Sequence, residues 1–382
     1  IPVSPPPVGS INVLGSCNLA HVAFDKLNDV AHDVRISGQG EQFTDASFIE
    51  LKSIGDTLSF ENNDGLARME FAKLHLVSAL EVKNNSLLQQ AEFPLLNYSI
   101  DGVYFSKNAA LDTLQLGLYS VDGSVIFSGG PRPFEKKHCV FAENPLLSDV
   151  TLQQLRSIKN EMRFTGFKDL VDAKLQFPVL KNVSTVIFEK NINVKIHSNI
   201  FAQLSTLDSF VFLENENFEL PKAFPWLVLL TEAEVKHNKG GSKLSFSNLT
   251  QVQTLTVQAN EAELDSVEMF PVLRTATGTI QYLSNPGITG VKFASLEAVG
   301  GELTLSGNSN LKSLEFLALT DFNQTIDVRN HATLSSIKFT KLTKVEGSVL
   351  FQCEDSVVLD DFGQVIPVSP PPVGSINVLG SC

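Results

Sequence analysis

Positive charge is scarce in this 382-residue chain, in which 29 Lys and Arg accompany 42 Asp and Glu for a net charge of −13. Nucleic-acid binding needs a basic surface, so no nucleic-acid partner is expected. No apolar run is long enough to cross a bilayer, and no membrane span is expected. The sequence lacks a Cys or His pair at metal spacing, a nucleophile elbow and a phosphate loop after a strand. We therefore expect no enzyme activity, cofactor or metal.

Tryptophan and tyrosine are also scarce, with one Trp and four Tyr, whereas 27 Phe are present. The Phe recur with a period of about 23 residues, which is typical of a solenoid. In the clearest repeat, Phe293–Glu315, the Phe is followed by Leu, Val, an apolar-x-apolar strand and an Asn. Repeats begin at Phe24, Phe48, Phe71, Phe93, Leu116, Leu152, Phe177, Phe201, Phe224, Phe246, Phe270, Phe293, Phe316, Phe339 and Phe362.

The Asn of the repeat is equally regular. It follows the strand at Asn63, Asn85, Asn108, Asn144, Asn191, Asn215, Asn238, Asn260, Asn285 and Asn308, and the same position holds Gln39, Phe167, His331, Glu354 and Ser381 elsewhere. Such short strands bury a face only by stacking on their copies about 4.8 Å away, which produces a parallel sheet. Each Asn then lies at a corner, and each stacked Phe contributes about 2–3 kcal/mol of transfer free energy. The chain is predicted to be all-β, a right-handed parallel β-solenoid of about fifteen rungs with Phe and Asn ladders.

The pattern L-x-L-x-x-N-x-x-L-x-x-L in Leu303–Leu314 resembles the receptor L-domain. That family is the leucine-rich-repeat-like β-helix of insulin- and EGF-receptor ectodomains and of fungal cell-wall proteins. The resemblance runs from Phe24 to the end and implies an architecture without an activity. Family members are short, usually capped and often followed by Cys-rich modules, and this chain departs from all three features. A ligand-receptor role is therefore not carried over.

Seventeen residues occur twice, as Ile1–Cys17 and as Ile366–Cys382. We interpret 1–23 as a partial rung at a unit junction, 24–365 as a continuous solenoid and 366–382 as the start of the next tandem unit. The Pro-rich part of the duplicate is either a flexible linker or a corner of a rung in phase with its neighbours. The repeat pattern described above favours a rung in phase with its neighbours. The Phe, Leu and strand positions of that pattern are filled by Ile11, Val13, Phe362, Val365, Ile376 and Val378.

One rung contains an insertion. Both Val125–Phe127 and Cys139–Phe141 fit the strand position, so a loop is predicted near 128–140. This loop contains a basic cluster with a Phe. An ordinary surface loop and a lateral contact between filaments are both open.

Cysteines and sequons bear on location. Cys139 lies in an inward strand position and is predicted to be a buried thiol. Neighbouring rungs bring Cys353 and Cys382 near disulfide distance, and Cys17 would pair likewise with the preceding unit. Sequons for N-glycans begin at Asn84, Asn97, Asn182, Asn248 and Asn323, and four of them share one side of the rung. Together these features favour an extracellular location.

The leading functional hypothesis is a structural protein, the repeating unit of an extracellular filament. Uncapped solenoid ends would stack head to tail, so the partner is a further copy of the chain. The alternative is a receptor-like or cell-wall adhesion module that binds a protein or glycan on its sheet face. A carbohydrate-active enzyme is less favoured, because no cluster of Asp and basic residues occurs in the strand positions. His237 and His331 are interpreted as corner residues.

Overall fold

The computed structural model describes residues 9–15, 19–128, 138–142, 144, 147, 149–168, 174–196, 200–220, 224–261, 269–331, 333–347, 349–353 and 376–379. The chain is an all-β parallel β-solenoid of about 13 rungs that recur about 23 residues apart, against the fifteen or so predicted. Phe362, at which the last predicted rung begins, lies outside the described residues, whereas the strand of that rung is described. Two compact units divide the chain. The N-terminal unit is Ile1–Ser184 with Ile200–Ala202, and the C-terminal unit is Thr185–Asn199 with Gln203–Cys382.

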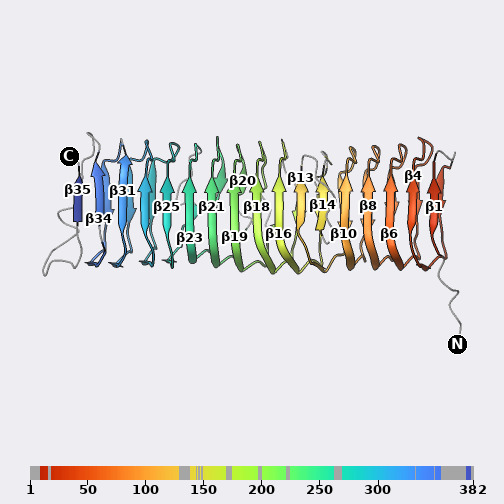
Figure 1. Ribbon diagram of the computed structural model, residues 1–382, viewed down its shortest axis with the longest axis horizontal. Coiled ribbons are helices and arrows are strands. Elements are labelled where there is room, and N and C mark those ends of the chain that lie inside the picture. Colours follow the sequence, from red (N-terminus) through yellow and green to blue (C-terminus); the bar gives the residue numbers. More distant parts are fainter. Residues whose placement is uncertain are drawn as a thin grey trace, which may run out of the picture. The chain divides into compact units, whose positions relative to one another are not determined.

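A long parallel sheet dominates the N-terminal unit, and its first strands stack in chain order (Figure 1). In β6 (Ser53–Glu61), Leu58 and Phe60 are fully buried while the alternating residues are not, as a half-buried strand requires. The neighbouring strands are β1 (Ile11–Leu14), β4 (Val34–Ser37), β8 (Leu76–Lys83) and β10 (Tyr98–Ser106), and β3 (Asp29–Val30) is a short extra partner of β6.

A second parallel sheet of the same unit is formed by the segments at the Phe positions. Its inward residues, such as Ala46, Met69 and Ala91, are small or flexible and fully buried. Its seven strands, in chain order, are β2 (His21–Ala23), β5 (Asp45–Ser47), β7 (Arg68–Glu70), β9 (Gln90–Phe93), β11 (Thr113–Leu116), β15 (Asp149–Thr151) and β17 (Lys174–Gln176).

Strand order and chain order differ at the insertion. The strand beside β10 is β14 (His138–Ala142), and β13 (Val125–Ser128) lies beyond it, although β13 comes first in the sequence (Figure 1). β13 then pairs with β16 (Ser157–Thr165), which also pairs with β12 (Ser120–Val121). Of the loop predicted near 128–140, Ser128 ends β13 and residues 138–140 belong to β14, whereas residues 129–137 lie outside the described residues. Both segments that matched the strand pattern are in the sheet.

A glycine makes room for the inserted strand. β10 bulges between Ser99 and Gly102, and Gly102 has a φ of 118°. A Cβ built on Gly102 would lie 2.3 Å from the carbonyl oxygen of His138, the first residue of β14. Glycine is therefore required where β14 begins.

The inserted strands also carry a second apolar layer. Val103, Phe105 and Phe141 face the main core, whereas the alternating residues point to the opposite side of the sheet. There Tyr104, Ile126, Val140 and Ala142 form a separate buried hydrophobic cluster. The sheet in this stretch is thus buried on both faces, as is typical of parallel strands that read as continuous apolar runs.

The C-terminal unit has a parallel sheet whose strands stack in chain order. They are β18 (Asn182–Glu189), which belongs to this unit from Thr185 on, β19 (Thr206–Leu213), β21 (Leu229–Lys236), β23 (Gln251–Gln258), β25 (Ile280–Leu283), β28 (Leu303–Ser306), β31 (Ile326–His331), β34 (Val349–Cys353) and β35 (Ile376–Leu379).

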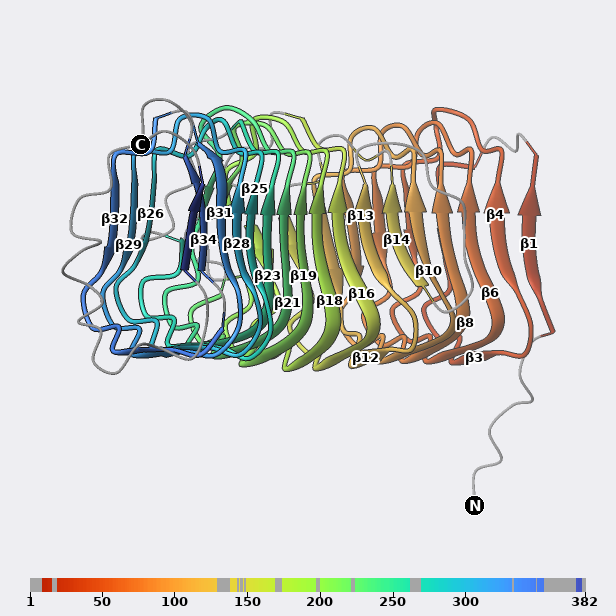
Figure 2. The same cartoon turned by 60° about the vertical axis from the view of Figure 1, so that its left-hand side comes forward.

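Short parallel ladders complete these rungs. Three of them pair β20 (Glu219–Leu220) with β22 (Lys243–Leu244), β24 (Thr275–Ala276) with β27 (Ala298–Val299), and β30 (Asp321–Phe322) with β33 (Lys344–Val345). In the fourth, β29 (Ser313–Phe316) lies between β26 (Gly290–Phe293) and β32 (Ser336–Phe339) and pairs with both. Figure 2 shows these three strands side by side and apart from β28, β31 and β34.

The predicted Phe stacks are present in both units. In the N-terminal unit the ring centroids of Phe48 lie 5.3 Å from Phe24 and 5.1 Å from Phe71. In the C-terminal unit Phe316 lies 5.5 Å from Phe293 and 5.2 Å from Phe339. These spacings are close to the distance between neighbouring strands, so the rings stack because the rungs do.

Candidate functional site: the corner ladder and the assembly edges

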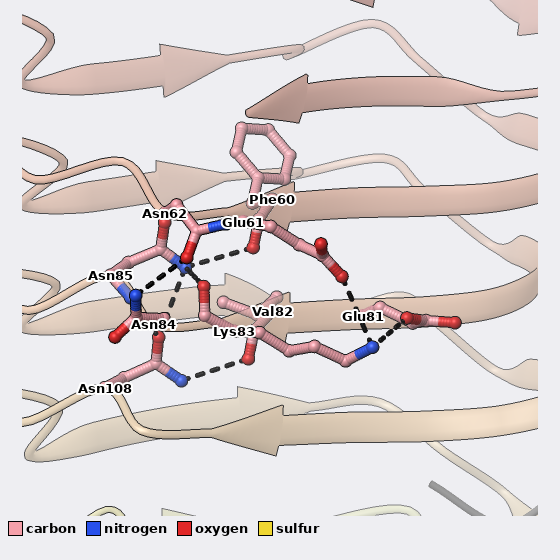
Figure 3. Close-up of polar contacts among 9 residues, drawn as sticks. All are labelled: Phe60, Glu61, Asn62, Glu81, Val82, Lys83, Asn84, Asn85 and Asn108. Atoms are coloured by element: carbon pink, nitrogen blue, oxygen red, sulfur yellow. Dashed lines mark hydrogen bonds and ion pairs between the residues drawn. The ribbon is translucent and has the colours of Figure 1, made fainter. Parts of the chain in front are cut away.

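Asn85 shows how the corner ladder works (Figure 3). Its backbone N–H and its Nδ2 donate to Oδ1 of Asn108, at 3.1 and 3.2 Å. Its Nδ2 also donates to the Phe60 carbonyl at 3.1 Å, so one buried amide connects three rungs. Asn suits this role because one short side chain supplies both donors and an acceptor.

The ladder continues from the corner after β10 to the corner after the inserted β14. The N–H of Asn108 donates to Oδ1 of Asn144 at 3.1 Å, and Nδ2 of Asn144 donates to the Phe105 carbonyl at 3.0 Å. Asn144 follows β14, so β14 and not β13 leads into the corner. The insertion therefore lengthens one rung while the corner geometry is preserved.

In the C-terminal unit the same bonds repeat from each corner to the next. The backbone N–H of Asn215 donates to Oδ1 of Asn238 at 2.9 Å, and that of Asn238 donates to Asn260 at 3.0 Å. All of the Asn predicted for the ladder are buried: Asn63, Asn85, Asn108, Asn144, Asn191, Asn215, Asn238, Asn260, Asn285 and Asn308. The prediction of an Asn ladder is thus matched by the hydrogen bonds.

Two corners use a different buried side chain. Gln39 donates from its N–H to Oδ1 of Asn63 at 3.2 Å and from Nε2 to the Ser37 carbonyl at 3.0 Å. His331 places Nε2 3.3 Å from the Leu305 carbonyl and Nδ1 3.2 Å from the Asn308 carbonyl. Both therefore imitate the Asn amide with larger groups.

Four further residues were predicted to lie at corners, and two of them are described. Phe167 is half-buried, and His237 is exposed with a φ of 55°, as a corner residue can be. Glu354 and Ser381 lie outside the described residues.

A second, exposed pair of Asn flanks the ladder. Asn62 and Asn84 have φ of 56° and 53°, and Nδ2 of Asn84 donates to Oδ1 of Asn62 at 2.7 Å (Figure 3). Beside them Lys83 pairs with Glu81 and lies 3.3 Å from Glu61. Burial lowers the pKa of Lys83, but the hydrogen bond and the charges of both glutamates outweigh it and raise that pKa above its ordinary value. This pair was not predicted, although adjacent Asn residues at 62–63 and 84–85 are a visible signal in the sequence.

The corners of the C-terminal unit enclose a shallow hollow of about 490 Å³, lined by Lys190, Ile192, Glu214, Glu216, His237 and Lys239. Its charges neutralise one another: Lys190 lies 3.9 Å from Glu214, and Lys239 lies 3.5 Å from Glu261.

The duplicated segment forms a strand in both of its copies. As β1, Ile11 and Val13 pair with Val34 and Ile36 of the following rung. As β35, Ile376 and Val378 pair with Val349 and Phe351 of the preceding rung. The strand parts of the predicted junction are therefore in phase. Phe362 and Val365 lie outside the described residues.

Cys139 is a buried thiol, as predicted, and is 2% exposed. Burial raises its pKa from 9.0 to about 12, against a smaller lowering by a hydrogen bond from the Val103 backbone. Cys353 ends β34, whereas Cys17 and Cys382 lie outside the described residues. The Cys353–Cys382 pairing stays a prediction, and the described residues contain no disulfide.

All five sequon asparagines are exposed: Asn84, Asn97, Asn182, Asn248 and Asn323. Four of them lie between a Phe position and the next main-sheet corner, which leaves their side chains accessible to a modifying enzyme.

Among the described residues, no group of three or more His, Cys, Asp and Glu is placed to hold a metal ion. In the same residues, no helix has the length and apolar character needed to cross a membrane.

No protein-family model matches the sequence. The chain is similar to sporulation-specific protein 2 of Saccharomyces cerevisiae, with 27% identity over 256 residues. The similarity covers 61% of this chain and 46% of the yeast protein, so the chain spans about half the length of this relative. It is a distant homologue, and the comparison assigns no function.

Proposed function

We propose that the chain is the repeating unit of an extracellular filament, in which units join head to tail through the duplicated segment. The observation that carries the proposal is the pairing of one tetrapeptide, Ile-Asn-Val-Leu, in two directions. As β1 it pairs forward with β4, and as β35 it pairs backward with β34.

Superimposing the two copies of this tetrapeptide gives a strand with both edges paired. Val349 would lie opposite Ile11, and Ile11 lies opposite Val34, all in parallel register. The sheet would then run from one unit into the next without an open edge. A heterologous contact of this kind does not close on itself, so it propagates as a fibre.

The Phe stack supports the same arrangement. Phe24 stacks on Phe48 at 5.3 Å and is 37% exposed, and Leu14 of β1 is 61% exposed. An added rung would cover these groups and contribute apolar burial of about 2–3 kcal/mol per large side chain. The exposed sequons support an extracellular location.

Hydrogen exchange on a two-unit chain, residues 1–365 followed by 1–382, tests the junction. We expect the Ile-Asn-Val-Leu amides at the internal junction to exchange as slowly as those of β23. Replacing Val13 by Asp at the internal junction should speed exchange there, and the same change in the first copy is the matched control. Fast exchange at the unmodified internal junction would establish a flexible linker instead. Electron microscopy of the same material should show filaments one solenoid wide.

The second candidate is an adhesion module, which is favoured by exposed apolar side chains such as Leu76, Tyr98 and Tyr119. Saturable binding of a protein or glycan by a chain that stays monomeric would support it over the filament.

A further inference from the structure

Exposed hydrophobic side chains are concentrated at two places in the described residues. Eight of the twelve large ones belong to two clusters. The tyrosine cluster consists of Leu76, Leu95, Tyr98, Ile100 and Tyr119, and the tryptophan cluster consists of Trp226, Val228 and Leu229. Exposed apolar patches on a folded chain mark sites that something else covers.

A sequon lies within the tyrosine cluster. Asn97 is exposed, and the N–H of Tyr119 donates to the Asn97 carbonyl at 3.1 Å. Tyr119 therefore occupies, in the next rung, the position that Asn97 occupies in its own rung. The N–H of Arg156 donates to the Tyr119 carbonyl at 2.9 Å, and its guanidinium lies 4.9 Å from the centre of the Tyr119 ring. The rungs of Asn97 and Arg156 therefore flank Tyr119 on opposite sides.

A second sequon lies beside the tryptophan cluster. Trp226 follows Phe224 by two residues, and Asn248 follows Phe246 by two, so they hold the same position in successive rungs. Nδ2 of Asn248 donates to the carbonyl of Pro225 at 2.5 Å, which directs the Asn248 side chain towards the rung of Trp226. A glycosylated amide keeps one N–H and can keep this bond. Trp226 is 63% exposed.

The sequons at Asn182 and Asn323, which share this side of the rung, lack an aromatic neighbour of this kind. Asn323 has Glu346 at its position in the next rung, since Phe322 pairs with Val345. Asn182 is the first residue of β18, and its N–H donates to the carbonyl of Arg156 at 3.2 Å. These two sites serve as internal controls.

We infer that N-linked glycans on Asn97 and Asn248 cover the two clusters, with the first sugar packed on the rings of Tyr119 and Trp226. The apolar C–H face of a sugar complements the negative face of an aromatic ring. Attachment to the adjacent rung supplies that sugar at high effective concentration. The inference rests on the extracellular part of the proposed function.

The modification itself is an ordinary group transfer. The bond between sugar C1 and the diphosphate of a lipid-linked oligosaccharide breaks, and the C1–Nδ2 bond forms. The amide releases one proton, and the lipid diphosphate leaves. The Nδ2 atoms of Asn97 and Asn248 are on exposed residues, as this transfer requires.

Trp226 is the single Trp of the chain, so tryptophan fluorescence reports on this cluster alone. The full chain is secreted from a eukaryotic host that adds high-mannose glycans, and peptide mass spectrometry measures the occupancy of each sequon. Acrylamide quenching is then compared for the intact glycoprotein, for the form trimmed to one sugar by endoglycosidase H, and for Asn248→Gln. We expect the first two to be quenched about twofold less than Asn248→Gln, because a packed sugar shields one ring face. Asn323→Gln is the matched control and should leave quenching unchanged.

The tyrosine cluster has a parallel readout. Tyr119→Ala should speed the release of the Asn97 glycan by PNGase F under native conditions, whereas Glu346→Ala should leave release at Asn323 unchanged. Glycans on Asn182 and Asn323 with bare Asn97 and Asn248 would overturn the inference and leave the filament proposal intact. Occupied Asn248 with unchanged Trp226 quenching would also overturn it. A chain without any glycan would overturn it together with the extracellular location, and saturable oligosaccharide binding to bare clusters would favour the adhesion module.

Discussion

Residues 206–258 and residues 98–165 contain the same strand pattern but build their rungs differently. In the first stretch, β19, β21 and β23 pair in constant register, and outward residues such as Glu232 and Thr256 stay at least partly exposed. In the second stretch, β10 bulges, β14 and β13 exchange order, and the outward residues are apolar and buried. In regular rungs only the inward face of the sheet is buried. Where a strand is inserted, the outward face is apolar and buried as well.

Both stretches keep the corner ladder, which shows what the solenoid tolerates. Extra residues enter between one corner and the next, and the next buried Asn resumes the ladder, as Asn144 does after Asn108. The comparison leads to four predictions, from the largest effect to the smallest.

Gly102→Ala should be the most damaging change to the irregular stretch. It forces a Cβ to within 2.3 Å of the His138 carbonyl and strains a φ of 118°, so we expect a loss on the order of 3–5 kcal/mol of unfolding free energy. Gly290→Ala is the control in a regular strand, where the new Cβ would meet the Ser313 hydroxyl at 3.3 Å and the Ser313 carbonyl oxygen at 4.0 Å. Urea denaturation measures both, and equal midpoints would show that β14 does not depend on this approach.

Asn238→Ala should be the most damaging change to the regular ladder. It leaves the N–H of Asn215 and the carbonyl of Phe212 without their partner, so we expect a loss of about 2–4 kcal/mol. Glu261→Ala removes only an exposed ion pair with Lys239 and should change stability by less than about 1 kcal/mol. The same urea titrations compare them, and a loss at Asn238 no larger than at Glu261 would remove the ladder from the account of stability.

The thiol of Cys139 should make the irregular stretch sensitive to high pH. The unfolded thiol ionises near 9.0 while the folded thiol keeps its proton until about 12, so the unfolded state binds fewer protons between these values. Stability should therefore fall by about 1.4 kcal/mol per pH unit in this window and be unaffected by this group below it. Denaturation at pH 8, 9 and 10 should show a shallower decline for Cys139→Ala than for the unmodified chain. Parallel declines for the two proteins would contradict the assignment.

Replacing the ladder histidine by asparagine, in His331→Asn, should give the smallest effect. His331→Asn places an amide where the imidazole now meets the carbonyls of Leu305 and Asn308, and we expect a gain of about 1 kcal/mol at pH 7. Asn308→His is the reverse change inside the regular ladder and should destabilise. A loss of stability in His331→Asn would show that the imidazole is the better fit at that corner.

Much of this architecture is visible in the sequence because each rung repeats a local pattern. The Phe at position 48 and the Asn at position 85 could be assigned from spacing alone, since a period of about 23 residues leaves one way to superimpose the rungs. The order of β13 and β14 could not, because both segments fit the strand pattern equally well. The clusters around Tyr119 and Trp226 were also missed, because exposure depends on which residues adjacent rungs place together.

The sequence by itself determined the class of fold, the inward and corner positions, and the phase of the duplicated Ile-Asn-Val-Leu segment. These follow from alternation along a strand and from the repeat, which are properties of neighbouring residues. Only the tertiary structure decided which strand lies between β10 and β13, and that Gly102 admits it. It also decided that Arg156 and Asn97 flank Tyr119. Such choices depend on contacts between residues far apart in the chain, where packing selects among segments that local pattern leaves equivalent.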